Sequence, residues 1–504
     1  MGSIGRGIVL SYVNILLGII SGIFLTPFMI QAMGKSEYGL YILIGSVVGY
    51  MSVFDFGINN ALIRFVSKYR AEGDTISEQK FLGQGILVYL LLALLIVLVG
   101  YGFYLNIDAV FGQSLTIEEL SKAKQMFVVL LINIAITVPG GAFDGVINAY
   151  ERYEIPRISR SLRIVSRVIL IYYVLKNDGD AISVVLIDTA INIIIVGLNA
   201  FYCFKVLKIK LIFSFDRIIF VTMFSYSFWV FLNTIIDQLY WKMGQTLLGI
   251  FENTAEVAVY AVAATIIAYY MTISGSLVGI FLPKATKMFV EKIAPNEITT
   301  FMVKVGRIQS FILIGVLVGF VFFGKKFIIL WVGLDFMESY YIIIVTLIGL
   351  TPYLIQSIGG ILLQAYGKFS IRTLILLTIV IFNLFLAIFL VKIYAGLGVA
   401  YSTAISFMIQ FIVLSLYYKK TFGISLKQYY GGLIQGWEYG IFIIIGLGFI
   451  CSVFNFTDEL WSSFLWNSML FLLFYLMSIY FIVLKSTEKS VLLKYLKSKM
   501  HKFL

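Results

Sequence analysis

The sequence predicts an all-α membrane protein with about fourteen transmembrane helices, and three of its properties support this fold class. Of its 504 residues, 61% are hydrophobic and 13% are charged, about half of the charged share in soluble domains. Long apolar stretches recur along the whole chain, separated by short charged or turn-forming segments. Most of the 38 Lys and Arg residues fall in alternate connections, as the positive-inside rule requires.

Each predicted span holds about 20 mostly apolar residues, the length of helix that crosses about 30 Å of hydrocarbon. The fourteen spans lie near residues 8–33, 39–66, 81–105, 125–150, 156–175, 181–204, 217–248, 255–282, 303–324, 340–365, 373–391, 396–418, 439–456 and 461–484. The stretch KKFIILWVGLDF closely follows the ninth span, and a re-entrant segment there is the alternative.

The distribution of Lys and Arg places both ends of the chain in the cytoplasm. With the N-terminus inside, most basic residues fall in cytoplasmic connections, so the net charge of +12 reflects membrane topology. These residues lack the interleaved aromatic side chains of a strand-binding groove, so we expect no nucleic-acid partner. The basic C-terminal tail, KSTEKSVLLKYLKSKMHKFL, is predicted to lie on the anionic inner leaflet, with a solvated tail as the alternative.

The few histidines and cysteines exclude several classes of site. The only histidine is His501, and the two cysteines, Cys203 and Cys451, lie far apart and form no CxxC pair. A zinc site, a disulfide framework and a catalytic triad are therefore not expected. We accordingly predict no catalytic residue, no cofactor and no metal site, and a protein that is not an enzyme.

Two pairs of stretches indicate an internal duplication. The stretch SEYGLYILIGSVVGYM from Ser36 is similar to AEVAVYAVAATIIAYY from Ala255, and NAYERYEI from Asn148 is similar to QAYGKFSI from Gln364. The offsets are 219 and 216 residues. They predict two parallel six-helix lobes, residues 1–210 and 211–420, around a central cavity, followed by two extra helices and the tail in 421–504.

Four arginines at the start of the fifth span raise the question of function. Arg157, Arg160, Arg163 and Arg167 lie within about 120° of one helix face and precede eight apolar residues, which cover only about 12 Å. The helix crosses a bilayer only if Arg163 and Arg167 lie inside it, which is costly unless they face a wet or paired interior. We therefore predict a cationic cavity, open to the cytoplasm, for an anionic guest. Headgroup anchoring of Arg157 and Arg160, and an aspartate partner for Arg167, are the alternatives.

A family resemblance adds to this prediction. The stretch GKSEYGLYILIGSVVGYMSVFDFGINNALIRFVSKYRAEGD, the duplicated AYERYEI and AYGKFSI elements and the fourteen spans resemble the polysaccharide flippases. These are the O-antigen-flippase, or Wzx-type, proteins of the multidrug/oligosaccharidyl-lipid/polysaccharide exporter superfamily. The resemblance implies a passenger oligosaccharide on a polyprenyl diphosphate, moved by alternating access from the cytoplasmic to the outer leaflet of the bacterial inner membrane.

With this resemblance, charged and polar residues inside the spans become candidates for the substrate cavity. The candidates for the diphosphate and acidic sugars are Arg64, Arg163, Arg167 and Lys242, and those for sugar hydroxyls are Asn59, Asn60, Asp237 and Gln238. The candidates for a coupling ion, proton or sodium, are Asp55, Asp144, Asp188 and Asp237. Structural pairing between helices is the alternative for each aspartate.

The expected partners are the polyprenyl-diphosphate-linked glycan and membrane lipids, with a polysaccharide polymerase and chain-length proteins as candidates, and we expect a monomer. Three other functions stay open. A peptidoglycan-precursor flippase would share the fold. A drug/cation antiporter typically carries an acid in its first helix, whereas residues 8–33 contain none. A glycan polymerase or ligase usually needs a long outer loop, whereas the longest here, 106–124, is short.

Overall fold

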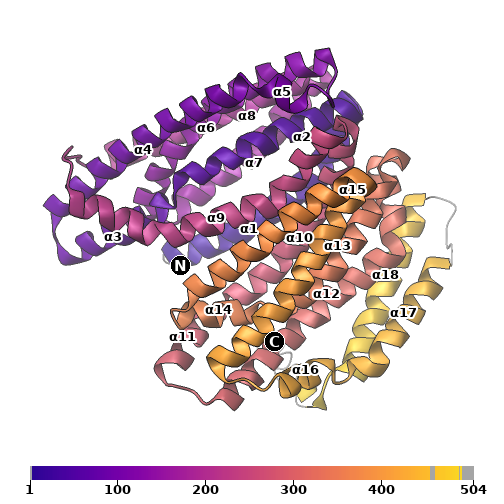
Figure 1. Ribbon diagram of the computed structural model, residues 1–504. Coiled ribbons are helices and arrows are strands. Elements are labelled where there is room, and N and C mark those ends of the chain that lie inside the picture. The colour runs from indigo at the N-terminus through magenta and orange to yellow at the C-terminus, as the bar shows by residue number, and fades with distance from the viewer. Residues whose placement is uncertain (1–2, 454–459, 487, 491–504) are drawn as a thin grey trace, which may run out of the picture. The chain divides into compact units, whose positions relative to one another are not determined.

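The computed structural model describes residues 3–453, 460–486 and 488–490, and this part of the chain forms helices and connecting turns without strands (Figure 1). The chain divides into two compact units. The first comprises Met1–Thr265 and Val380–Val399, and the second comprises Ile266–Ile379 and Ala400–Leu504. Most of the predicted inner-leaflet tail, residues 491–504, lies outside the described residues.

The first unit contains the helices that later position the candidate site. They are α1 (Ser3–Met33), α2 (Lys35–Tyr50), α3 (Ile58–Glu72), α4 (Thr75–Tyr104), α5 (Ile107–Phe111), α6 (Ile117–Ala149), α7 (Glu154–Lys176), α8 (Ala181–Phe201) and α9 (Arg217–Phe251). Figure 1 shows α4, α6 and α8 side by side, and α7 packs against α1, α6 and α8.

The second unit contains the remaining helices, with α10 and α15 running across the division. They are α10 (Thr254–Gly279), α11 (Leu282–Val290), α12 (Pro295–Val332), α13 (Met337–Ile355), α14 (Ile358–Ala365), α15 (Phe369–Phe422), α16 (Leu426–Ile434), α17 (Trp437–Val453) and α18 (Leu460–Ser478). The stretch KKFIILWVGLDF continues α12 to Val332, so the re-entrant alternative is wrong.

In the described part of the chain, eleven helical spans are long and apolar enough to cross a membrane, or twelve if the bent α9 is one span. The charged α7 is not among them, although its 23 residues match the predicted fifth span. The 54-residue α15 counts once, although Ala395 with φ 46° and ψ −127° interrupts it where two spans are predicted to meet. The all-helical membrane fold is confirmed, and the number fourteen stays a prediction.

The helix boundaries repeat at the offsets of the duplicated stretches. Helices α2 and α10 begin at Lys35 and Thr254, which are 219 residues apart, and α6 and α14 end 216 residues apart. Glu151 and Gly367, also 216 apart, both have left-handed φ values, of 59° and 65°. The compact units divide near Thr265 rather than at residue 210, because α9 packs against α2 and α3. The six-helix lobes and their boundaries stay predictions.

Backbone geometry divides the second predicted span into α2 and α3. Phe56 and Gly57 both adopt left-handed conformations, with φ of 49° and 72°, which neither helix can continue. A Cβ atom on Gly57 would lie only 2.8 Å from the Cβ of Val230. Glycine is thus required here both for conformation and for the close approach of α9.

A buried arginine ties the last helices of the second unit to α12. Arg307 is 1% exposed, and its guanidinium donates to both carboxylate oxygens of Glu488, at 2.7 and 2.8 Å. It also donates to the carbonyl oxygens of Val483 at 2.9 Å and of Gln435 at 2.5 Å. These bonds hold the α16–α17 connection and the segment after α18 against one point of α12.

We expect Arg307→Ala to lower the free energy of unfolding by about 3–5 kcal/mol, because it leaves the Glu488 carboxylate without its cation. Thermal unfolding in one detergent measures the effect. Lys304→Ala is the control, since Lys304 is an exposed lysine on the same helix. Equal melting temperatures for the two variants would contradict the assignment.

The same pair predicts a pH dependence of stability. Burial is the largest single influence and opposes ionisation of Glu488, but the hydrogen bonds and positive charges of Arg307 and Lys485 together hold the pKa of Glu488 below its ordinary value. A lowered folded-state pKa stabilises the protein above about pH 4.5, and this contribution is lost as pH falls below it. The melting temperatures of wild type and Glu488→Gln should therefore differ at pH 7 and converge below about pH 4. A constant difference would count against the pair.

Candidate functional site

Helix α7 carries the four predicted arginines, and the structure gives them different surroundings. Arg157, Arg160 and Arg163 line one cavity, and Arg167, one turn further along, does not. Arg163 lies about 14 Å along the helix from its first residue, at 1.5 Å per residue. The cationic face that the sequence predicts is therefore divided between a cavity and a second environment.

The cavity lies within the first unit and has a volume of about 790 Å³. Helices α1, α6, α7 and α8 supply its walls. Its lining residues are Ser11, Asn14, Ile15, Gly18, Asp144, Asn148, Pro156, Arg157, Ser159, Arg160, Arg163, Ile164, Ile195 and Asn199. Three guanidinium groups, one carboxylate, three amides and two hydroxyls thus face a space large enough for a diphosphate and part of a sugar.

Arg157 is the arginine that holds α1 against α7. Its Nε donates to the Ser11 hydroxyl at 2.9 Å, and its Nη1 donates to the carbonyl of Tyr153. The Asn14 amide donates to the Arg157 carbonyl at 2.9 Å and accepts from the Ser161 hydroxyl at 2.6 Å. These bonds fix one wall of the cavity.

Arg160 and Arg163 differ from Arg157 because neither makes a hydrogen bond or ion pair with any described residue. Arg160 is exposed, and Arg163 is half-buried with an enclosed Nε that has no partner. A guanidinium has five N–H donors, and leaving buried donors unpaired is costly. These two side chains therefore suit an anion that accepts from them together, as phosphate oxygens do.

The opposite wall carries one acid. The Asn199 amide donates to Asp144 Oδ1 at 2.6 Å, and the Asn199 carbonyl accepts from the Ser159 hydroxyl at 3.0 Å. The Asn148 amide donates to the Asp144 main-chain carbonyl at 2.8 Å. Asp144 makes no ion pair within 4 Å in the described part of the chain, so its carboxylate faces the cavity as an acceptor.

Arg167 has the aspartate partner that was the alternative prediction. Its Nε donates to Asp188 Oδ1 at 2.7 Å and its Nη2 to Oδ2 at 3.3 Å, while Nη2 also donates to the Tyr41 hydroxyl at 2.8 Å. The Tyr41 hydroxyl in turn donates to Asp188 at 3.0 Å. This bidentate pair joins α7, α8 and α2, so Asp188 neutralises a fixed charge.

The candidates of the second span lie outside the cavity. Asp55 accepts from the Tyr89 hydroxyl at 2.7 Å. The Asn59 side-chain oxygen is buried, and it stands 2.4 Å from where a Cβ on Gly145 would lie. Asn60 is exposed, as is Arg64, whose guanidinium lies 5.6 Å from the centroid of the Phe65 ring.

The candidates on α9 are also separate from the arginines. The Lys242 side chain runs along α2, with its Cε 3.5 Å from where a Cβ on Gly49 would lie. The Gln238 amide donates to the Ser52 hydroxyl at 2.9 Å, and Asp237 is exposed. Arg163 is thus the one predicted substrate residue, and Asp144 the one predicted coupling residue, that line the cavity.

Sequence reasoning missed the neutral polar residues of the cavity. They are Ser11, Asn14, Asn148, Ser159 and Asn199. Three signals could have found them: Asn14 and Asn199 interrupt apolar spans, and Asn148 begins the duplicated element. For Arg157 and Arg160, headgroup anchoring was the alternative to the predicted cavity, and both residues line the cavity together with Arg163.

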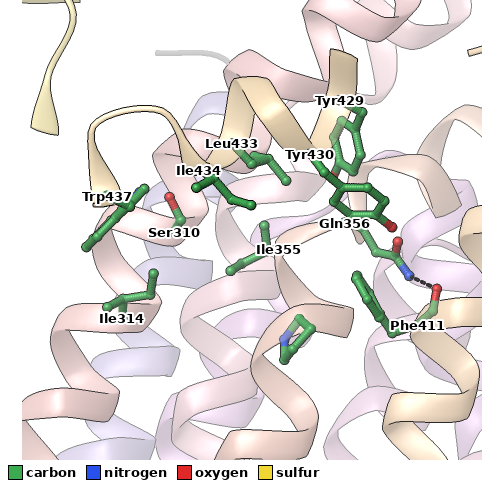
Figure 2. Close-up of a pocket in the computed structure, with 11 residues that line it drawn as sticks. Ser310, Ile314, Ile355, Gln356, Phe411, Tyr429, Tyr430, Leu433, Ile434 and Trp437 are labelled. Carbon is green, nitrogen blue, oxygen red and sulfur yellow. Dashed lines mark hydrogen bonds between the residues drawn. The ribbon is translucent and has the colours of Figure 1, made fainter. Parts of the chain in front are cut away.

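A smaller pocket in the second unit has a different chemistry. Figure 2 shows aromatic and aliphatic side chains around a space of about 220 Å³, among them Phe411, Tyr430 and Trp437. Gln356 donates to the carbonyl of Phe411 at 2.9 Å, so its amide nitrogen is already engaged. The lining of this pocket is neutral, and it therefore offers no cation for an anionic guest.

Comparison with known proteins identifies a family and two relatives of this chain. A family model described as polysaccharide biosynthesis protein matches residues 5–283. The chain is 22% identical over 405 residues to a putative O-antigen transporter of Shigella flexneri, covering 78% of this chain and 92% of that protein. It is 24% identical over 421 residues to a probable low-salt glycan biosynthesis flippase, Agl15, of Haloferax volcanii, covering 81% of each.

Solved structures show the same fold. The lipid II flippase MurJ in an inward closed conformation is similar with a TM-score of 0.74 at 18% identity, over 94% of this chain and 97% of that chain. An inward-facing MATE multidrug resistance transporter of the MOP superfamily is similar with a TM-score of 0.66 at 13% identity, over 84% and 98%. The chain therefore has the fold of these exporters.

The two adjacent arginines of α7 should differ in their effect on stability. We expect Arg167→Ala to lower the free energy of unfolding by about 1–3 kcal/mol, because the Asp188 carboxylate, only 19% exposed, would lose its bidentate cation. Arg163→Ala should change it by less than about 1 kcal/mol, because this side chain has no hydrogen-bond or ion-pair partner to lose among the described residues. Thermal unfolding of both variants in one detergent tests the contrast, and the reverse order would contradict it.

Proposed function

The chain belongs to the polysaccharide biosynthesis protein family, and we propose that it moves a lipid-linked oligosaccharide across the membrane. One relative is named an O-antigen transporter and another a glycan biosynthesis flippase, and both align with most of this chain. Transport of this kind makes and breaks no covalent bond. It requires a site that binds the polar end of the lipid and a protein that alternates between two open states.

In this proposal the cavity of the first unit receives the diphosphate and the sugar next to it. Arg160 and Arg163 bind phosphate oxygens, and Arg157 adds positive charge from a fixed position. The observation that carries the proposal is Arg163, a half-buried guanidinium on a cavity wall without a partner among the described residues. The proposal gives Arg167 a different role, because its bonds to Asp188 and Tyr41 hold α7 to α8 and α2.

Related functions fit the cavity less well. A drug/cation antiporter would have to attract cations into a lining with three guanidinium groups and one carboxylate. A peptidoglycan-precursor flippase shares the anionic headgroup, but the likeness to MurJ at 18% identity concerns the fold. The named relatives therefore favour a surface or exported glycan as the cargo.

The proposal includes the location of the protein in the cell and the proteins it works with. The protein would lie in the bacterial inner membrane with both termini in the cytoplasm, so that the cavity receives lipid-linked glycan where it is synthesised. It would act as a monomer, and a polysaccharide polymerase and chain-length proteins would use the exported glycan. No catalytic group takes part in any of these steps.

We expect the double variant Arg160→Ala/Arg163→Ala to abolish export of the glycan, because it removes both unpaired guanidinium groups from the cavity. The variant is expressed in a strain whose own copy of this gene is deleted, and surface polysaccharide is measured by gel and by immunoblot. Membrane amounts of the protein are measured in parallel.

The matched control is Arg217→Ala, which removes an exposed arginine of the same unit that does not line the cavity. It should leave export within about twofold of wild type, as surface substitutions usually do. Normal surface polysaccharide from the double variant would refute the assigned site.

A further inference from the structure

We propose that Asp144 makes the cavity select a glycosylated lipid diphosphate over the bare lipid diphosphate. The inference rests on the proposed function, because it assumes that the arginines bind the diphosphate. It concerns a residue that anion binding alone does not explain. A carboxylate among three guanidinium groups weakens the attraction of the cavity for any anion.

The structure holds Asp144 firmly in this unfavourable place. Asn199 donates to Oδ1 at 2.6 Å, and the Asn199 carbonyl is itself fixed by the Ser159 hydroxyl at 3.0 Å. The Asn199 side chain therefore presents its N–H to Asp144 and cannot flip without losing both bonds. The carboxylate is half-buried, and neither Arg160 nor Arg163 lies within ion-pair distance of it.

Other titratable groups near Asp144 do not neutralise it. Arg163 on α7 attracts its charge from beyond ion-pair distance, and Arg160 lines the same cavity. Tyr89 on α4 and Cys203 after α8 also interact electrostatically with Asp144. The Tyr89 hydroxyl donates its hydrogen bond to Asp55 and so does not donate it to Asp144. Apart from the bond from Asn199, no described residue donates to the Asp144 carboxylate, so its remaining acceptor positions are available to a guest.

An ionised carboxylate can only accept hydrogen bonds. A sugar attached to the diphosphate carries hydroxyl groups, and these can donate hydrogen bonds to the Asp144 carboxylate. Asn148 adds a second acceptor, because its amide nitrogen donates to the Asp144 main chain at 2.8 Å and its side-chain oxygen bonds to no described residue. Asp144 and Asn148 therefore form an acceptor wall opposite the arginines.

A bare lipid diphosphate fits this wall poorly for two reasons. It is a monoester with more negative charge than the glycosylated diester, so the carboxylate repels it more strongly. It also brings no hydroxyl donors, and a site built to bind hydroxyls rejects a ligand that leaves its polar groups unpaired. Asp144 is thus a specificity-determining residue that keeps the unloaded carrier from competing with the loaded one.

The test compares two probes, farnesyl diphosphate and glucosyl farnesyl diphosphate, binding to the purified full-length protein in lipid nanodiscs by calorimetry at pH 7.5. Wild type should bind the glycosylated probe at least about tenfold more tightly. Asp144→Asn should bind the bare probe about tenfold more tightly than wild type does, because the repelling charge is gone. The preference should then fall to about threefold or less.

Two further variants separate charge from hydrogen bonding. Asn148→Ala removes a hydrogen-bond acceptor and keeps the charge of the cavity. It should therefore weaken binding of the glycosylated probe and leave the affinity for the bare probe unchanged. Glu252→Gln is the matched control, since Glu252 is a half-buried carboxylate of the same unit that does not line the cavity, and it should keep the wild-type preference.

The outcomes distinguish the two proposals. If wild type binds both probes equally well, the specificity assigned to Asp144 is wrong and anion binding stands. If Asp144→Asn keeps the wild-type preference for the glycosylated probe, the specificity assigned to Asp144 is likewise wrong. If wild type binds neither probe, the proposed function fails, and the inference fails with it.

Discussion

A guanidinium group inside a membrane protein needs either a partner or a polar cavity, and this requirement shapes the whole first unit. Helix α7 carries four arginines in less than three and a half turns. Exposing all of them to the hydrocarbon of the bilayer would cost too much free energy. The structure satisfies the requirement in two ways. Arg167 obtains a bidentate carboxylate, and the arginines before it face a space lined by amides, hydroxyls and one acid.

The same requirement explains why the paired and unpaired arginines have different roles. Pairing with Asp188 and Tyr41 fixes the position of α7 relative to α8 and α2, so the cavity keeps its shape. Arg157 does the same toward α1 through Ser11. Arg160 and Arg163 can then stay unpaired at defined positions, which is the arrangement that binds an anion without first breaking internal bonds.

In the second unit, the buried guanidinium of Arg307 is satisfied by fixed partners within the protein. Arg307 is enclosed by Glu488 and by main-chain carbonyl groups. The N–H groups that bond to them are therefore not available to a ligand. Its pocket nearby is neutral and aromatic. The cavity lined by three guanidinium groups thus lies in the first unit, within the part of the chain that the polysaccharide biosynthesis family model matches.

The sequence by itself determined the helical membrane fold, the position of most spans, the duplicated boundaries and the anomaly of α7, because these depend on composition and on local periodicity. It also supported the resemblance to polysaccharide flippases, which the comparisons confirm. Only the tertiary structure decided that Arg167 pairs with Asp188, whereas Arg163 has no hydrogen-bond or ion-pair partner among the described residues. Both lie on one helix face, and their surroundings depend on which side chains α2, α6 and α8 bring to them. Pairing between helices depends on how each helix is rotated and packed, and no local pattern in one sequence records that.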